Sequence, residues 1–217
     1  VYRKTQSVWP VDIDSDGLMD LACAQGVSSS KTSYDGDIVW RRNLGNHSFS
    51  KAELISSGVA TPRSICAADL DGDGDADVLS TSVMDNKIAW YENLGGGAFG
   101  AQRVITTAAL QARSVYATDL DGDGDADVLS ASWCDHKIAW YENLAGVAFG
   151  PPYVIITAAN HPAPAHATVS DGNGGADLRQ ALPVYDNTAH YAHPGGGATG
   201  HLLVADTCLN ASLTVPH

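Results

Sequence analysis

Basic residues are scarce in this chain, and their scarcity excludes one large class of partners. The 217 residues include 12 Lys and Arg against 25 Asp and Glu, which gives a formal net charge of −13 at pH 7. A nucleic-acid-binding surface needs a stripe or cluster of positive charge, and the sequence contains none. We therefore expect no nucleic-acid partner.

Long apolar runs, helical periodicity and closely paired cysteines are also missing. No stretch approaches the roughly 20 apolar residues of a membrane-spanning helix, so no direct membrane span is expected. The four cysteines, Cys23, Cys66, Cys134 and Cys208, form no C-x-x-C pair, so a zinc site is not indicated. Whether any of them form disulfides stays open, because pairing cannot be deduced from sequence.

What the sequence has in abundance is aspartate at alternate positions. Five aspartates alternate in residues 69–77, and the pattern recurs almost letter for letter at 119–127 and more loosely at 12–20. These carboxylates would repel one another without a cation, and no Lys or Arg lies inside the loops. In D-x-D-x-D-G-x-x-D, the first, third, fifth and ninth residues can offer carboxylates to Ca²⁺, and the seventh its backbone carbonyl. Glycine at the sixth position permits the sharp bend.

The spacing therefore predicts three calcium sites and a weaker fourth. The predicted ligands are Asp12, Asp14, Asp16, Leu18 and Asp20 in the first loop, Asp69, Asp71, Asp73, Asp75 and Asp77 in the second, and Asp119, Asp121, Asp123, Asp125 and Asp127 in the third. Leu18 at the seventh position supports a carbonyl role there, so the side chains of Asp75 and Asp125 are expected to face solvent. The fourth copy keeps Asp171, Asn173 and Asp177 but has Val169 at the first position, so we expect weak binding or an empty site.

Two other interpretations of the loops fit less well. An EF-hand needs a Glu at loop position twelve and flanking helices, whereas Ser80 and Ser130 stand there between strand-like segments. A set of solvated Asp-Gly turns would account for one such loop but not for three matched ones.

The similarity extends beyond the loops to a unit of about fifty residues. The segment KIAWYENL at 87–94 recurs at 137–144, and a looser copy lies at 38–45. We predict one repeat domain over residues 1–217. Its blades are expected at about 1–60, 61–110, 111–160 and 161–217, the last being degenerate because His190-Tyr191 replaces Trp-Tyr.

Each unit is expected to contain four short strands, rich in aromatic and β-branched residues and separated by Gly, Asn and Asp. In the third unit these strands are predicted at 114–118, at 127–132, at 137–142 and within 149–156. The first unit has extra residues at 26–36, which we interpret as an enlarged surface loop. The predicted fold is all-β, a β-propeller built from four-stranded antiparallel blades.

These motifs resemble the FG-GAP/VCBS repeat, the calcium-binding blade of integrin α-subunit propellers and of several secreted lectins. The residues that carry the resemblance are the DLDGDGDADVL loops at 69–79 and 119–129, the KIAWYENL segments and the Ala-Phe-Gly turns at 98–100 and 148–150. The resemblance covers nearly the whole chain and implies the propeller fold and Ca²⁺ binding. It does not decide the function, because such propellers serve adhesion, sugar binding and enzyme scaffolding alike.

The resemblance also implies a ring of about seven blades, whereas this sequence supplies four. The array is then a small closed ring, a fragment of a larger propeller, or part of a ring that another chain completes. We favour an incomplete or partner-completed array, in which an oligomer or larger assembly covers the open blade faces.

Several aromatic, cysteine, histidine and arginine residues outside the loops also have expected roles. Trp90-Tyr91 and Trp140-Tyr141 are expected to fill the space between blades rather than to stack on sugars, and Cys66 is expected to be a small core residue. His136 replaces Asn86 of the preceding repeat, so we expect a turn residue rather than a catalyst. Trp133 replaces Val83 and is a candidate for ligand contact. Arg63 and Arg113 are expected either to line the mouth of a ring or to pair with nearby aspartates.

These observations favour a non-catalytic, calcium-stabilised module that binds glycans or protein partners. The alternatives are a structural subunit of a larger multi-chain assembly, and a scaffold domain of an extracellular polysaccharide-active enzyme. Asn46 and Asn210 begin N-x-S sequons and are candidate glycosylation sites. Sequons and calcium loops together favour a secreted, cell-surface or lumenal location, where calcium is on the order of millimolar.

Overall fold

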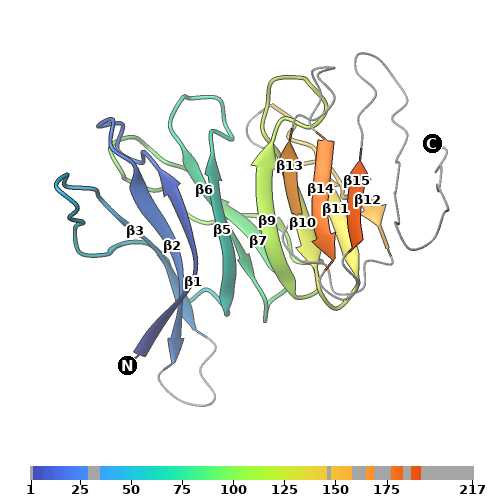
Figure 1. Ribbon diagram of the computed structural model, residues 1–217, viewed down its shortest axis with the longest axis horizontal. Coiled ribbons are helices and arrows are strands. Elements are labelled where there is room, and N and C mark those ends of the chain that lie inside the picture. The colour runs from blue at the N-terminus through green and yellow to red at the C-terminus, as the bar shows by residue number, and fades with distance from the viewer. Residues whose placement is uncertain are drawn as a thin grey trace.

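The chain folds into a row of antiparallel β-sheets. The computed structural model describes residues 2–28, 35–145, 148–157, 165–168, 177–182 and 187–191. Within these ranges every regular element is a β-strand, and none is a helix of membrane-spanning length and apolarity. Figure 1 shows the sheets standing side by side, in sequence order from the N-terminal sheet to the C-terminal one.

The first two sheets each have four strands in sequence order. The first contains β1 (Tyr2–Val11), β2 (Asp20–Ser28), β3 (Gly36–Arg41) and β4 (Glu53–Ser57). The second contains β5 (Pro62–Ala68), β6 (Asp77–Ser82), β7 (Lys87–Tyr91) and β8 (Arg103–Thr106). The predicted loop at 26–36 was wrong at both ends, because Gly26 and Gly36 pair with each other as the last residues of the β2–β3 ladder.

The third sheet repeats this arrangement, and the fourth is shorter within the described residues. The third contains β9 (Ala112–Thr118), β10 (Asp127–Ser132), β11 (Lys137–Tyr141) and β12 (Tyr153–Ile156). The fourth contains β13 (Ala165–Thr168), β14 (Asp177–Leu182) and β15 (Asn187–Tyr191). The predicted four-stranded antiparallel unit is confirmed in the first three sheets.

The first strand of each sheet forms the inner edge of the row. Strand β1 contacts β5, β5 contacts β9, and β9 contacts β13. This is the arrangement of propeller blades, whose innermost strands surround a common axis. The first and fourth sheets lie at opposite ends of the row in Figure 1, so the described sheets do not close into a ring.

The Trp-Tyr pair of the repeat packs the sheets together. Adjacent residues of a strand point to opposite faces, so each Trp faces the following sheet and each Tyr faces the preceding one. Trp40 and Tyr91 belong to one core cluster between the first two sheets, and Trp90 and Tyr141 belong to the cluster between the second and third. All four are at most 3% exposed, which confirms that these residues fill the space between blades, whereas Trp140 is partly buried and lies in neither cluster.

One position of the repeat, on the innermost strands, holds residues of different size. Trp9, Cys66 and Tyr116 occupy equivalent positions on β1, β5 and β9. The small Cys66, 1% exposed, lets the flanking rings meet edge to face, with centroids 6.1 Å apart. Cys66 is therefore a core residue, as predicted, and Tyr at this position would compete with Trp9 for the same space.

Candidate metal centres

Three aspartate loops lie at the same end of the row of sheets. Each one connects the innermost strand of a sheet to the next strand, that is β1 to β2, β5 to β6 and β9 to β10. In Figure 1 they are the loops at the top of the first three sheets. The repeat therefore places three equivalent groups of carboxylates along one edge of the molecule.

The first, third and ninth residues of each loop bring carboxylate oxygens together. The three groups are Asp12, Asp14 and Asp20, then Asp69, Asp71 and Asp77, then Asp119, Asp121 and Asp127, and within each group the oxygens lie within 4.8 Å of one another. A donor set made only of carboxylate oxygens fits a hard cation such as Ca²⁺, which takes six to eight oxygens. The chemistry of the donors therefore fits the expected ion, with further ligands left for backbone carbonyls or water.

Backbone amides fix the orientation of the first aspartate. Asp69 Oδ1 accepts a hydrogen bond from Gly72 N at 2.8 Å, and its Oδ2 accepts one from Gly74 N at 2.9 Å. Gly74, the sixth loop residue, has φ of 93°, in the left-handed region that glycine adopts without strain. The third loop repeats the same bonds from Gly122 and Gly124 to Asp119.

The ninth aspartate is fully buried and holds the loop to a distant segment. Asp77 is 0% exposed. Its Oδ2 accepts from Leu70 N at 3.0 Å, and its Oδ1 accepts from Asn93 N at 2.7 Å. Burial raises the pKa of Asp77 to about 7 against the lowering effect of these amides, and the charge of Asp71 adds to the rise. A bound cation would offset that penalty.

The same buried geometry recurs in the other two loops. Asp127 accepts from Leu120 N at 3.1 Å and from Asn143 N at 2.8 Å, and burial raises its pKa to about 6. Asp20 accepts from Ile13 N and Asn43 N. The ninth aspartate is thus a structural residue whether or not it also binds a metal.

The fifth and seventh residues lie outside the three carboxylate groups. The fifth carboxylate accepts a hydrogen bond from the seventh amide, at 2.8 Å from Asp73 to Asp75 N and at 2.9 Å from Asp123 to Asp125 N. Asp16 does the same with Leu18 N at 2.8 Å.

The expectation that Asp75 and Asp125 face solvent is met only in part. Both residues are partly buried, and Asp75 Oδ1 accepts a hydrogen bond from the Ser15 hydroxyl of the neighbouring loop at 3.1 Å. The first two loops stand close enough for the seventh residue of the second to contact the fourth residue of the first.

The first loop carries a different charge balance. Arg42 Nε lies 2.5 Å from Asp14 Oδ2, an ion pair with one of the candidate ligands. The equivalent residues of the next two repeats are Glu92 and Glu142. Burial raises the pKa of Asp71, and the charges of Asp73 and Glu92 raise it further. The second loop is therefore more negative than the first, and a cation gains more by binding there.

An asparagine links each loop to the next sheet. Asn93 Nδ2 donates to Ile13 O of the first loop at 2.8 Å and to Ala76 O of its own loop at 3.2 Å. Asn143 repeats this with Leu70 O at 2.8 Å and Ala126 O at 3.1 Å. The linking role of this Asn was not predicted from the sequence. Its presence in all three good copies, as Asn43, Asn93 and Asn143, was the available signal.

Asn43 has the same local geometry without the inter-sheet bond. Its Nδ2 donates to Met19 O at 2.9 Å, and its Oδ1 accepts from Gly45 N at 3.0 Å, as Asn93 does with the equivalent atoms. Within the described part of the chain, no sheet lies before the first to supply a second carbonyl. Asn43 is partly exposed, whereas Asn93 and Asn143 are buried.

The histidine and tryptophan residues named from the sequence lie outside the aspartate loops. His136 and Asn86 have φ of 54° and 56° and occupy equivalent turns, as predicted. Trp133 is partly buried, and the Arg113 guanidinium carbon lies 3.8 Å from its ring centroid. Trp140 stacks on Tyr153 of the same sheet at 4.9 Å.

Some predicted residues lie outside the described part of the chain or away from the three loops. Asp171, Asn173 and Asn210 lie outside the described residues, and Asp177 is the first residue of β14. Asn46 is exposed in a turn, with φ of 50°. The described cysteines Cys23, Cys66 and Cys134 are free thiols.

Comparison with known proteins places this geometry in a family. A family model described as the FG-GAP-like repeat matches residues 12–80 and again residues 69–130, which together make up more than half of the chain. A search of curated proteins finds no match.

Three solved structures have similar folds. An Agrocybe aegerita lectin, described as recognising non-reducing terminal N-acetylglucosamine, is 16% identical with a TM-score of 0.55, over 91% of this chain and 64% of the lectin. A Bacillus licheniformis rhamnogalacturonan lyase is 13% identical with a TM-score of 0.54, over 93% and 43%. The exotype rhamnogalacturonan lyase YesX is 14% identical with a TM-score of 0.52, over 93% and 41%. The chain thus spans less than two thirds of each, and at these identities the likeness establishes the fold.

Proposed function

Because the chain belongs to the FG-GAP-like repeat family, we propose that it is a calcium-stabilised, non-catalytic recognition module that binds glycans outside the cell. The observation that carries this proposal is the threefold repetition of one all-carboxylate group in one structural position. A fold that used these aspartates only as turn residues would not need three oxygens of like charge within 4.8 Å in every loop.

Calcium has a structural role in this proposal. Asp69, Asp71 and Asp77 would hold one ion, and the matching residues of the first and third loops would hold two more. The ion would neutralise the carboxylates and so stabilise the connection between the two innermost strands of each sheet. Such loops fill most readily where calcium is abundant, which supports a secreted, cell-surface or lumenal location.

The glycan part of the proposal is supported by the fold. The similar solved structures include a lectin and two lyases whose names refer to carbohydrates. The only histidine that sequence analysis weighed as a catalyst, His136, lies in a turn that Asn86 forms equally well. These observations favour recognition over catalysis, with a protein ligand as the alternative outcome of the test.

The test is glycan-array binding in calcium and in EDTA, with a variant that weakens the metal groups. Asp71→Asn with Asp121→Asn removes one carboxylate from each of two groups, and each of these side chains accepts only a single long amide bond of 3.2–3.3 Å. We expect glycan binding that falls in EDTA and in this variant. Binding that survives both would overturn the role of calcium, and the absence of any glycan signal would overturn the ligand class.

A second candidate, an assembly subunit, is favoured by the outer face of the first sheet. Cross-strand register places Val8, Cys23, Val39 and Leu54 on the face away from the second sheet. Val8 and Leu54 are 47% and 60% exposed, whereas Cys23 and Val39 between them are 4% and 2% exposed. Asn43 keeps its Nδ2 oriented as in the inter-sheet links. We propose that a second copy of the chain covers this face, with a loop carbonyl accepting from Asn43.

Sedimentation over a range of concentrations tests this association. We expect a concentration-dependent oligomer that Leu54→Glu weakens, because it places a charge in the contact. Leu94→Glu is the control, since Leu94 is 61% exposed and lies outside this face. A chain that stays monomeric at all concentrations, or variants that behave alike, would contradict the proposal.

A further inference from the structure

Three consecutive innermost strands are irregular at the same level. The ladder of β1 shifts between Thr5 and Ser7, which leaves Gln6 without a cross-strand partner. The ladder of β5 skips Arg63 and Ser64, and the ladder of β9 skips Arg113. An extra residue in a strand ladder is a β-bulge, which changes the direction of its side chain. Such bulges are frequent beside binding sites.

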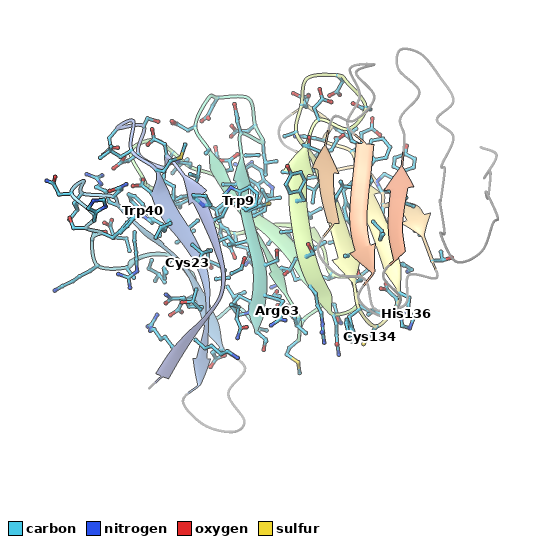
Figure 2. The ribbon with its side chains drawn as sticks, viewed as in Figure 1. Trp9, Cys23, Trp40, Arg63, Cys134 and His136 are labelled. Atoms are coloured by element: carbon cyan, nitrogen blue, oxygen red, sulfur yellow. The ribbon has the colours of Figure 1, made fainter. Side chains whose placement is uncertain are left out.

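The bulges place Gln6, Arg63 and Arg113 in a row across the inner edge of the sheets. Arg63 Nη1 donates to Gln6 Oε1 at 3.0 Å, which joins the first two members. The Arg113 guanidinium lies over the Trp133 ring at 3.8 Å, a cation–π contact that holds the third. Figure 2 shows Arg63 toward the lower end of β5, away from the aspartate loops at the top.

The two arginines lack acidic partners in a strongly acidic chain. Among the described residues, ion pairs form at Arg3, Arg42, Lys87, Arg103 and Lys137, but at neither Arg63 nor Arg113. Within the described residues, the expectation that they pair with nearby aspartates is therefore not met. Burial lowers the pKa of Arg113, and the neighbouring charge of Arg63 lowers it further. Two like charges are held near each other, and no carboxylate of the described residues neutralises them.

We propose that Gln6, Arg63, Arg113 and Trp133 form a binding site for an oxyanion group carried by a sugar. The guanidinium fork matches a carboxylate or sulfate with two parallel hydrogen bonds, and the Gln6 amide is available to a sugar hydroxyl. The site lies at the end opposite the metal loops, so it is distinct from them. It rests on the proposed glycan-binding function and narrows it to acidic glycans.

Paired charged and neutral oligosaccharides test the proposal by titration calorimetry in calcium. One arm compares a galacturonate oligomer with its methyl ester, and the other compares a sulfated oligosaccharide with its desulfated form. We expect at least tenfold tighter binding of the charged member in one arm, and the arm identifies whether the group is carboxylate or sulfate. Arg63→Gln should weaken that binding about tenfold or more, as removal of a charged hydrogen-bond partner does.

The controls separate this site from general charge and from misfolding. Lys51→Gln removes the same charge from an exposed residue elsewhere and should change affinity less than twofold. Arg113→Lys keeps the charge but loses the fork and the stacking on Trp133, so it should weaken binding while the melting temperature stays near that of the parent chain. Arg63→Gln and Lys51→Gln with equal effects would overturn the proposal.

Its failure is distinguishable from failure of the glycan function. Equal binding of charged and neutral sugars, unaffected by Arg63→Gln, would overturn the oxyanion site and leave glycan recognition standing. If no sugar binds, titration with inorganic sulfate decides: Arg63-dependent binding supports the oxyanion site without the glycan function, and no binding overturns both.

Discussion

The ninth aspartate of each loop shows how one residue serves folding and metal binding together. Asp127 is 0% exposed and accepts two backbone hydrogen bonds, one from its own loop and one from the segment after β11. Its carboxylate is also a member of the third metal group. The requirement for a carboxylate here therefore persists when calcium is absent.

Replacing Asp127 should destabilise the fold even in a chelator. Asp127→Ala leaves the amides of Leu120 and Asn143 buried without acceptors, which should lower the free energy of unfolding by about 2–4 kcal/mol. Asp125→Ala removes the same charge from the same loop and should cost less than about 0.5 kcal/mol. Urea unfolding of both variants in EDTA measures the difference, and equal losses would show that Asp127 acts only through a metal.

Burial also makes two of the described thiols differ in reactivity. Cys66 is 1% exposed, and burial raises its pKa to about 12, whereas Cys134 is exposed. Because the thiolate is the reactive form, an alkylating reagent should modify Cys134 in the native protein and Cys66 only after unfolding. Peptide mapping by mass spectrometry reads the outcome, and rapid native labelling of Cys66 would contradict the packing of the inner edge.

At the scale of elements, the asparagine link joins each sheet to the loop of the sheet before it. Asn93 spans from the end of β7 to Ile13 in the first loop, and Asn143 spans from the end of β11 to Leu70 in the second. Adjacent sheets are thus joined by directional bonds at the metal edge as well as by apolar packing between their faces. Loss of order in one loop should propagate to the next sheet through this bond.

The link can be measured with a control from the same repeat. Asn93→Ala removes both the inter-sheet bond and the local bonds, whereas Asn43→Ala removes only the local ones. The carbonyl of Ile13 is left buried in the first case, so Asn93→Ala should cost about 1–3 kcal/mol more. Calorimetric unfolding of the two variants compares their stabilities. Equal losses would show that the Asn93–Ile13 bond does not couple the two sheets.

Charge at one position should set the relative affinity of the loops. Arg42 pairs with Asp14 where the other repeats have Glu, so Arg42→Glu should raise the calcium affinity of the first loop by about tenfold or more. Arg41→Glu introduces the same charge at the next residue, whose guanidinium instead donates to Ser50 O at 2.9 Å. Calcium titration by calorimetry distinguishes them, and no gain over the Arg41 control would show that the Arg42–Asp14 pair does not limit calcium binding.

At the scale of the whole molecule, the three loops should make stability depend on the calcium concentration. They lie along one edge of a row of sheets that does not close within the described residues. Each filled site at ten times its dissociation constant should add about 1.4 kcal/mol to the free energy of unfolding.

Calcium removal should therefore lower the melting temperature. We expect EDTA to do so clearly, and readdition of calcium in excess of the chelator to restore it. Differential scanning calorimetry over a calcium series measures the effect. Melting temperatures that coincide in EDTA and in calcium would show that no loop holds an ion of energetic consequence.

Repetition made much of the fold predictable from sequence. Strand-forming residues between turn signals placed β10 at 127–132, as observed, and the Trp-Tyr pairs indicated inter-sheet packing that Trp90 and Tyr91 display. The limits of the 26–36 loop were missed, because Gly26 is a strand residue through its pairing with Lys4 and Gly36, and Gly36 through its pairing with Gly26. The side-chain contact of Asp75 was missed for a similar reason, since its partner Ser15 belongs to another loop.

The sequence alone determined the repeat, the strand content and the alternate aspartates, because these depend on neighbours within a few residues of one another. The tertiary structure decided which carboxylates converge, with the first, third and ninth together and the fifth turned to a backbone amide. It also decided that Asn93 reaches a carbonyl 80 residues away and that three bulges align two arginines that form no ion pair among the described residues. Those relations arise only when separate sheets pack side by side, since local sequence does not fix distances between them.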